Sequence, residues 1–477
     1  MTEFAKIKFG TSGWRAIMAE EFTFANVRRV VQAIATHIKA GPERPVIVGY
    51  DTRFLSPEFA RTAADVLAAN GLQVIFSRDF IPTPVISFQI RRLKTAGAIN
   101  FTASHNPAEY NGIKFNTADG APSNPDVTHE IERLANQDGE TGRGEDKGKF
   151  PGPAVPQESI QTFDGRPSYL KALHRIIDAG ALKKAKLKVG VDVLYGTGRG
   201  YLDEFLCEAG CRAEVLHNWR DVRFGGQSPE PALPQLNEMV KVMREKKLSA
   251  GFGTDGDADR FGVIDDDGTM LSPNEILPMV LRHLIKTRGW KGLVVRSVMT
   301  SHFIDAVARR HNLPLKETPV GFKYIAEAML AGDFLMGGEE SGGLTIQGHV
   351  PEKDGILACL LMAEVRAVER KSFREILKQL RRDVGPYFSK RVNLHLKNDV
   401  MQALRERLSS FNPSSIDGLV VKRINRLDGF KFIFQDDSWL GVRLSGTEPV
   451  VRLYLEADSI KKLKDLEKIG TKLIESK

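Results

Sequence analysis

The sequence has few of the features that mark membrane, secreted or nucleic-acid-binding proteins. No apolar run reaches the roughly 18–20 residues that are needed to span a bilayer. The first residues, Met1 to Lys6, lack the charged-then-apolar pattern of a signal peptide. We therefore expect a cytoplasmic protein with no membrane partner.

Basic residues are not gathered into a dense patch with interleaved aromatic residues, although the net charge is +8. The only locally dense stretch is 366–382, which has the pattern of a solvated helix face. This distribution argues against a nucleic-acid partner, while a modest positive field suits a small anionic substrate.

Cysteine is scarce, because the chain contains only three, and this makes a structural disulfide framework unexpected. Cys207 and Cys211 are four residues apart and could share a helix face. No His or Cys stands at the spacing that would complete a metal site with them. We therefore interpret both as buried core thiols.

The length of 477 residues is too great for one core, so we expect three or four domains. Three segments repeat one pattern, in which a β-branched strand is followed by a helix, a second strand and a third strand that leads into a polar loop. The first strands are 46–53, 188–198 and 293–301; the helices are 57–69, 199–209 and 302–310; the second strands end at 71–76, 213–216 and 313–315; the third strands are 98–101, 249–253 and 334–336. This pattern predicts a threefold βαβ repeat with functional loops at equivalent strand ends.

The tail has a different pattern, with strands at 391–396, 419–424, 430–434 and 451–456 and helices at 398–410 and 458–474. It predicts an α+β module. A linker-like stretch at 137–160 and breaks after Gly268 and near 383–386 separate the parts. We predict domains at 1–155, 156–268, 269–385 and 386–477, the first three α/β and the last α+β.

The first polar loop, within 95–107, presents Ser104 among Thr102, His105, Asn106 and Pro107. Ser104 could be a plain helix N-cap or a phosphorylated nucleophile. The spacing is not that of a Ser-His-Asp hydrolase, and adjacent side chains such as His105 rarely have the geometry of a base. Lys114 could shuttle a proton, or it could be a surface lysine after a turn.

The second loop, 254–260, carries aspartates at 255, 257 and 259. This spacing can direct three carboxylates toward one point, and oxygen ligands suit a hard cation. A calcium EF-hand would need Gly and Glu where Arg260 and Asp266 stand. We therefore favour Mg²⁺, with Arg260 available for a phosphate.

Two further loops complete the set. In 338–342, Glu339 and Ser341 can point the same way and bind neighbouring sugar hydroxyls, while Glu340 points away. In 443–449, the pattern of a phosphate site is formed by Arg443, Ser445, Gly446 and Thr447, with Arg452 nearby. Together the four loops indicate phosphoryl transfer on a polyol.

In this order the loops resemble those of the α-D-phosphohexomutase family, which includes phosphoglucomutase, phosphomannomutase and phosphoglucosamine mutase. The resemblance rests on Thr-Ala-Ser-His-Asn-Pro at 102–107 and Asp-Gly-Asp-Ala-Asp-Arg at 255–260, and it covers essentially the whole chain. It implies three α/β domains with mixed sheets and a C-terminal α+β domain, arranged in a heart shape around a central cleft.

The resemblance also implies roles for individual residues. The catalytic residues would be Ser104 as the phosphoserine, Arg15, Lys114 as the proton shuttle, His105 and Arg260; the Mg²⁺ ligands would be Ser104, Asp255, Asp257 and Asp259; the substrate contacts would be Thr318, Gly321, Lys323, Glu339, Ser341, Lys353, Arg443, Ser445, Gly446, Thr447 and Arg452. Arg15 ends the stretch 9–15, which is similar to the family's N-terminal loop.

The implied reaction passes a phosphoryl group from Ser104 to a hexose 1-phosphate and forms glucose 1,6-bisphosphate, which turns over and returns the other phosphoryl group. The C-terminal domain would move on a hinge near Gly385 and Pro386. We expect small hexose phosphates as partners and a monomer or homodimer.

The chain departs from the family's pattern at two places, and the first bears on the sugar. Gly343 stands where phosphomannomutase and phosphoglucosamine mutase relatives often carry His, and 349–355 is more like phosphoglucomutases. These positions favour glucose. Leu444 replaces a common Pro and is interpreted as neutral. The alternatives are a phosphomannomutase or phosphoglucosamine mutase, a sugar phosphatase, or a non-catalytic sensor of sugar phosphates.

Overall fold

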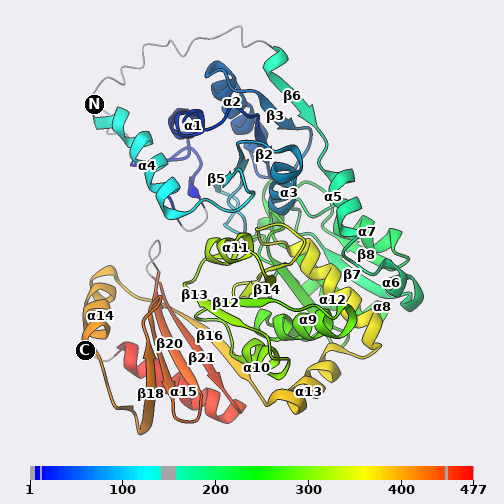
Figure 1. Cartoon of the computed structure of the whole chain (residues 1–477), viewed down its shortest axis with the longest axis vertical. Helices are drawn as coiled ribbons and strands as arrows, with labels where there is room; N and C mark the ends of the chain where they lie inside the picture. The colour runs from blue at the N-terminus through cyan, green and yellow to red at the C-terminus, as the bar shows by residue number, and fades with distance from the viewer. Residues whose placement is uncertain (1–5, 11–12, 141–156, 446–449, 476–477) are drawn as a thin grey trace. The chain divides into compact units, whose positions relative to one another are not determined.

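The computed structural model describes residues 6–10, 13–140, 157–445 and 450–475. The chain, drawn in Figure 1, divides into two compact units. Unit 1 comprises Met1–Leu271, Ala326–Gly332 and Gly342–Ser372, and unit 2 comprises Ser272–Ile325, Asp333–Ser341 and Phe373–Lys477. Within the described residues, no helix is long and apolar enough to cross a membrane.

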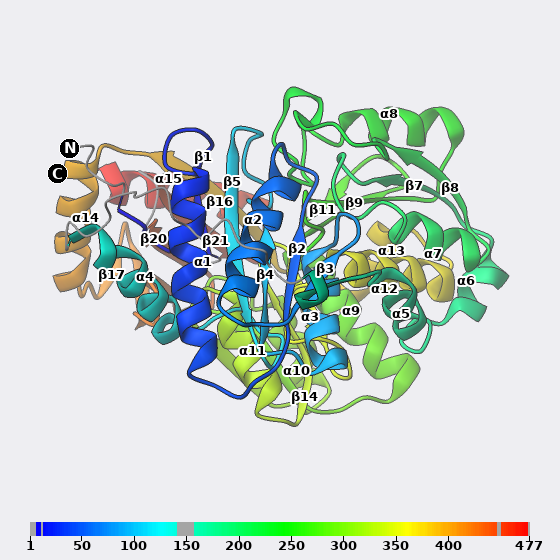
Figure 2. The same ribbon diagram turned by 90° about the horizontal axis from the view of Figure 1, so that it is seen from above.

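The first sheet of unit 1 is mixed and has the strand order β1-β5-β4-β2-β3-β6. Its strands are β1 (Trp14–Ile17), β2 (Val46–Tyr50), β3 (Val74–Ser77), β4 (Gly97–Phe101), β5 (Tyr110–Thr117) and β6 (Ile160–Phe163). Its helices are α1 (Phe24–Lys39), α2 (Ser56–Ala69), α3 (Thr83–Leu93) and α4 (Pro125–Glu140). Every residue of β2 and β4 is buried, because helices cover this sheet, as Figure 2 shows for α1 and α2.

The second sheet of unit 1 has the order β11-β10-β9-β7-β8. Its strands are β7 (Lys188–Asp192), β8 (Arg212–Leu216), β9 (Ala250–Thr254), β10 (Phe261–Asp265) and β11 (Met270–Leu271). The same unit holds α5 (Arg166–Leu173), α6 (Ala179–Ala185), α7 (Leu202–Glu208), α8 (Asn237–Lys246), β15 (Gly343–Ile346) and α12 (Gly355–Glu369). Helix α12 is apolar on nearly all sides and is almost fully buried.

Unit 2 begins with a parallel arrangement in which β12 (Leu293–Ser297) lies between β13 (Leu315–Thr318) and β14 (Phe334–Glu339). Its helices are α9 (Pro273–Arg288), α10 (Phe303–Arg310) and α13 (Phe373–Val384), and α11 (Phe322–Leu330) runs from unit 2 into unit 1. Helix α9 begins at a capping box formed by Ser272 and Glu275.

The tail of unit 2 is an antiparallel sheet in the order β16-β21-β20-β19-β18-β17. Its strands are β16 (Phe388–His395), β17 (Ser415–Ile416), β18 (Leu419–Asn425), β19 (Phe430–Phe434), β20 (Trp439–Leu444) and β21 (Val450–Ala457), and its helices are α14 (Asn398–Ser410) and α15 (Ile460–Glu475). Figure 1 shows these strands side by side in orange to red. The predicted α+β tail is confirmed.

The predicted threefold repeat is also confirmed. In each copy the first strand lies between the second and the third, as β3-β2-β4, β8-β7-β9 and β13-β12-β14. All these pairs are parallel. The third strand of each copy therefore carries its polar loop at the same edge. The predicted domain boundaries stay a prediction, and residues 141–156 of the predicted linker lie outside the described residues.

Three predictions about local structure were wrong. The first strands of the three copies end at Tyr50, Asp192 and Ser297, because the polar residues that follow lie in turns. The second strand of the third copy begins at Leu315 rather than ending there, because Pro314 has no amide hydrogen to donate and polar Lys316 and Glu317 obscure the strand pattern. Cys211 is buried as expected, but Cys207 is exposed near the end of α7.

A buried lysine joins the two parts of unit 2. Lys431 on β19 is fully buried, and its Nζ donates to the Val298 carbonyl at 2.7 Å and lies 3.0 Å from Nε2 of His302. The ammonium lies 3.8 Å above the ring of Trp439, whose Nε1 donates to buried Glu456 at 2.7 Å. Burial, with the nearby charge of Arg296, lowers the pKa of Lys431 to about 7.

This lowered pKa predicts a pH-dependent contribution to stability. The unfolded lysine keeps its proton to about pH 10, whereas folded Lys431 loses it above about pH 7. Between these two pH values the unfolded state binds more protons than the folded state. The contribution of Lys431 to the free energy of unfolding therefore becomes more favourable to the folded state as the pH rises. Relative to Lys431→Met, the wild type should gain stability between pH 7 and 9.5 in denaturant titrations. A constant difference would contradict the prediction.

Candidate active site

Ser104 lies in the turn that joins β4 to β5. It is buried and adopts the left-handed conformation, with φ of 53°. Its Oγ donates to Oδ2 of Asp255 at 2.7 Å, and its backbone N–H donates to Oγ1 of Thr102 at 2.9 Å. Since no helix begins at Ser104, the interpretation as a plain N-cap is wrong. The structure instead aims the hydroxyl at the acidic loop.

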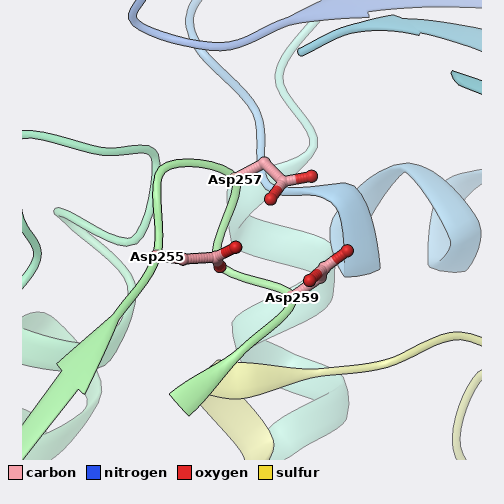
Figure 3. Close-up of side chains that lie close together, drawn as sticks. All are labelled: Asp255, Asp257 and Asp259. Atoms are coloured by element: carbon pink, nitrogen blue, oxygen red, sulfur yellow. The ribbon is translucent and has the colours of Figure 1, made fainter. Parts of the chain in front are cut away.

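The acidic loop joins antiparallel strands β9 and β10, which pair from Thr254 and Phe261 outward. The carboxylates of Asp255, Asp257 and Asp259 converge within 4.8 Å of one another and are all buried (Figure 3). The predicted convergence is confirmed. A hairpin loop also excludes the EF-hand alternative, which needs a helix on each side.

The three carboxyl groups differ in proton affinity. Burial, reinforced by the charges of Asp257 and Asp259, raises the pKa of Asp255 well above its ordinary value. Burial and Asp259 also oppose ionisation of Asp257, but Lys114 and a hydrogen bond from Thr83 outweigh them and lower its pKa. The pKa of Asp259 is lowered against burial by Lys114, Lys353 and Arg260.

These residues fit a hard cation. The Oδ1 atoms of Asp257 and Asp259 are buried, and neither has a hydrogen-bond partner among the described residues. Buried carboxylate oxygens are costly to leave unpaired. A cation held by oxygen ligands would satisfy both atoms, and the three-carboxylate set matches what Mg²⁺ prefers.

Lys114 is not a surface lysine, because it lies inside β5 and is buried. Its Nζ donates to Asp257 at 2.5 Å and to Asp259 at 2.8 Å. Burial alone would lower the pKa of Lys114, but the two carboxylates outweigh it and raise the pKa. Lys353 is also buried and lies 3.0 Å from Oδ2 of Asp259. Two ammonium groups therefore offset part of the negative charge of the three carboxylates.

The remaining predicted residues of unit 1 surround the same serine. Nδ1 of His105 lies 3.3 Å from Oγ of Ser104, and burial, together with Arg260 and Arg15, lowers the pKa of His105 well below its ordinary value. Neutral His105 can thus serve as a hydrogen-bonding partner. Arg15 donates to Asn106 at 2.7 Å, and the backbone N–H of Arg260 donates to Asp255 at 3.0 Å.

Unit 2 holds the predicted sugar-binding residues. Glu339 is buried at the end of β14, and its Oε1 accepts from the N–H of Gly321 at 2.7 Å. Gly321 has φ of 133°, which favours glycine. Thr318 ends β13 and is buried, and its hydroxyl donates to the Pro319 carbonyl at 3.1 Å. Ser341 is half-buried.

Glu340 pairs with Arg391 at 3.2 Å, and its predicted direction away from the sugar stays a prediction.

The predicted phosphate loop begins at the end of β20, a strand that sequence analysis missed. Arg443 lies directly across from Arg452 on β21, a like-charge pair that favours an anion nearby. The Nε of Arg443 donates to Asp428 at 3.1 Å, and Asp428 also accepts from the N–H of Val320 at 3.0 Å. Ser445 is buried, whereas Gly446 and Thr447 lie outside the described residues.

Asp428 also favours the charged form of Lys323, but burial dominates and lowers the pKa of that lysine. One carboxylate thus connects the segment 318–323 with Arg443. Sequence analysis missed Asp428, Thr83 and Arg53, because none stands in a loop with a recognisable pattern.

Four family models match the chain in order. They are described as phosphoglucomutase/phosphomannomutase alpha/beta/alpha domains I, II and III, at residues 6–142, 167–268 and 272–384, and the C-terminal domain, at 392–469. The chain belongs to the phosphoglucomutase/phosphomannomutase family. It is a phosphohexomutase-type protein of the α-D-phosphohexomutase family, as the resemblance implied.

Individual relatives are named as mutases of different sugar phosphates. The chain is 30% identical over 470 residues to a phosphoglucomutase/phosphomannomutase of Thermococcus kodakarensis, covering 98% of each chain. It is 30% identical over 455 residues to a probable phosphoglucosamine mutase of Methanothermobacter thermautotrophicus, covering 95% of this chain and 94% of the relative. The structure of a putative phosphomannomutase of Thermus thermophilus superposes with a TM-score of 0.84 at 32% identity, covering 99% and 100%.

The fit of the acidic cluster to a cation predicts stabilisation by Mg²⁺. MgCl₂ should raise the thermal midpoint of the wild type above that in NaCl of equal ionic strength, because the ion binds the folded state. Asp255→Asn should remove most of this shift. Asp267→Asn, outside the cluster, should keep it. An equal shift in Asp255→Asn would contradict the assignment.

The raised pKa of Asp255 predicts that protons compete with the metal. Because the ligand must be ionised, Mg²⁺ affinity measured by calorimetry should increase with rising pH as Asp255 loses its proton, and should do so above the pH range in which an ordinary carboxyl group titrates. Asp255→Asn should show a weaker affinity with a smaller pH dependence. If the Mg²⁺ affinity of the wild type does not change with pH, protons do not compete with the metal at this carboxyl.

Proposed function

We propose that this phosphohexomutase interconverts glucose 1-phosphate and glucose 6-phosphate through a phosphoserine at Ser104 and glucose 1,6-bisphosphate. The observation that carries the proposal is the 2.7 Å hydrogen bond from Oγ of Ser104 to Asp255, inside a buried three-carboxylate cluster. A buried hydroxyl beside a cation site suits phosphoryl transfer, which depends on positioning and charge stabilisation.

In the proposed reaction the bond between phosphorus and Oγ of phosphorylated Ser104 breaks as a sugar oxygen bonds to the same phosphorus. Asp255, Asp257, Asp259 and an oxygen at Ser104 would hold Mg²⁺, which neutralises charge on the transferring group when bound. Arg15, Arg260 and the neutral His105 are proposed to orient the phosphoryl oxygens. The second phosphoryl group of the bisphosphate then returns to Oγ.

Lys114 is the proposed proton carrier. In the first transfer its Nζ, as the neutral amine, would accept the proton of the attacking sugar hydroxyl, and in the return step the resulting ammonium would give that proton to the departing sugar oxygen. Its ammonium donates to Asp257 and Asp259, and a cation held by the same carboxylates would offset the two charges that now raise the pKa of Lys114. Such a change would bring the pKa of Nζ closer to the range in which proton exchange is efficient.

We assign the rest of the substrate to the other predicted residues. Glu339 and Ser341 would bind sugar hydroxyls, with Thr318, Gly321 and Lys323 beside them, while Lys353 contacts the phosphate or the sugar. Arg443, Ser445, Gly446, Thr447 and Arg452 would hold the distal phosphate. Because either end of the bisphosphate must reach this group, we propose movement at Gly385, where φ is 100°.

The alternative sugars are mannose and glucosamine phosphates, because relatives carry those names. We favour glucose because of Gly343 and the segment 349–355. In this segment the Asp354 carboxylate is bound by His349 at 2.7 Å and by Tyr169 of α5 at 2.5 Å, and these contacts hold the chain that carries Lys353.

The test is the initial mutase rate on glucose, mannose and glucosamine 1-phosphates, each with Mg²⁺ and a trace of the matching bisphosphate. We expect the highest kcat/KM for glucose 1-phosphate, and a loss on the order of 10⁴-fold or more in Ser104→Ala, which removes the nucleophile. Faster turnover of another sugar would assign the enzyme to that sugar. Phosphate release without isomerisation would indicate a phosphatase, and no turnover would favour a sensor.

A further inference from the structure

Arg53 is a charged residue without any exposed surface. It follows β2 in the turn that leads to α2, outside the four polar loops. Burial of a guanidinium costs several kcal/mol unless its donors are paired. Its contacts should therefore show why an arginine is kept at this position.

All five N–H donors of Arg53 have an acceptor, the full capacity of a guanidinium. The contacts are Nε to Oδ2 of Asp51 at 3.2 Å, Nη1 to the carbonyls of Pro107 at 2.6 Å and Tyr110 at 3.0 Å, and Nη2 to the carbonyls of Ser104 at 2.7 Å and Asn106 at 2.6 Å. Four of the five acceptors are backbone carbonyls of the single segment 104–110.

This segment needs external support, because Ser104 adopts a left-handed backbone conformation that is unfavourable for a residue with a side chain. Its carbonyl is held by Arg53 on one side and packs against Gly256 on the other, where an added Cβ would lie 2.6 Å from that oxygen. The direction of the serine backbone, and with it the direction of Oγ, is thus set by these two neighbours.

We propose that Arg53 is a positioning residue for the phosphoryl-transfer step, holding the segment 104–110 so that Oγ of Ser104 faces the carboxylate cluster. The inference rests on the proposed function of Ser104. Arg53 donates to the backbone of the nucleophile and takes no part in bond making. Asp51, which is fully buried, balances its charge and orients its Nε.

Lysine cannot replace this arrangement. Its three donors radiate from one nitrogen, whereas the planar fork of Arg53 reaches carbonyls at both ends of the segment. Arg53→Lys keeps the charge and removes part of the carbonyl contacts, so it separates geometry from electrostatics.

The experiment compares steady-state kinetics on glucose 1-phosphate with hydrogen exchange of the segment 102–110. In Arg53→Lys we expect kcat to fall about 100-fold with KM changed by less than about threefold, since a small displacement of a reacting group costs about this much. Amide exchange in 102–110 should accelerate at least about tenfold, because the segment opens locally.

Leu67→Ala is the matched control, because it removes a fully buried side chain from α2 in the same unit, and this apolar side chain makes no hydrogen bond to 102–110. At equal loss of thermal stability it should keep the wild-type kcat and segment exchange. If it reproduces the Arg53→Lys effects, the role of Arg53 is only structural and the proposal is overturned. Wild-type kinetics and exchange in Arg53→Lys would also overturn it.

Should Arg53→Lys fail to fold, Asp51→Asn decides the question. It keeps the four carbonyl contacts but weakens the pairing at Nε, so we expect a smaller fall in kcat and faster exchange in 102–110. Unchanged exchange would reject the proposal. Absence of mutase activity in the wild type would reject the proposed function instead, while the exchange measurements would still report whether Arg53 orders the segment.

Discussion

The active region depends on the concentration of negative charge at the loop 255–260. Three buried carboxylates within 4.8 Å repel one another strongly in a medium of low dielectric constant. The fold compensates with Lys114 and Lys353, and the remaining imbalance is expressed in the raised pKa of Asp255. The carboxylates of the loop can therefore bind a cation, and the two lysines reduce their mutual repulsion when no cation is bound.

The same constraint explains why the loop that carries Ser104 is so closely supported. To keep a serine facing this cluster, other contacts must offset its unfavourable backbone conformation and the conformational entropy that is lost when the loop is ordered. The Ser104 carbonyl, amide and hydroxyl each have a partner within unit 1. Unit 2 also buries charged side chains, but their partners are different. Lys431 contacts a backbone carbonyl and an imidazole, and Glu456 accepts from an indole N–H.

Regular elements with strong apolar patterns were predicted well from the sequence. Strands β4, β9 and β19 and helices α2 and α14 lie within a residue or so of their predicted bounds, because the strands are short runs of mainly small and apolar residues and the helices show a period of 3.6. Strand β5 was missed because polar Asn111, Lys114 and Asn116 are buried in it by partners from distant segments. Strand β20 was missed because its end was assigned to the phosphate loop.

The sequence by itself determined the family, the threefold repeat and the spacing of the three aspartates, because these depend on residue type and local periodicity along the chain. Only the tertiary structure decided that Lys114, 143 residues before Asp257, is its buried partner, and that Arg53 contacts the Ser104 segment. Charge interaction and burial depend on distance in space, which the spacing of residues along the chain does not reveal.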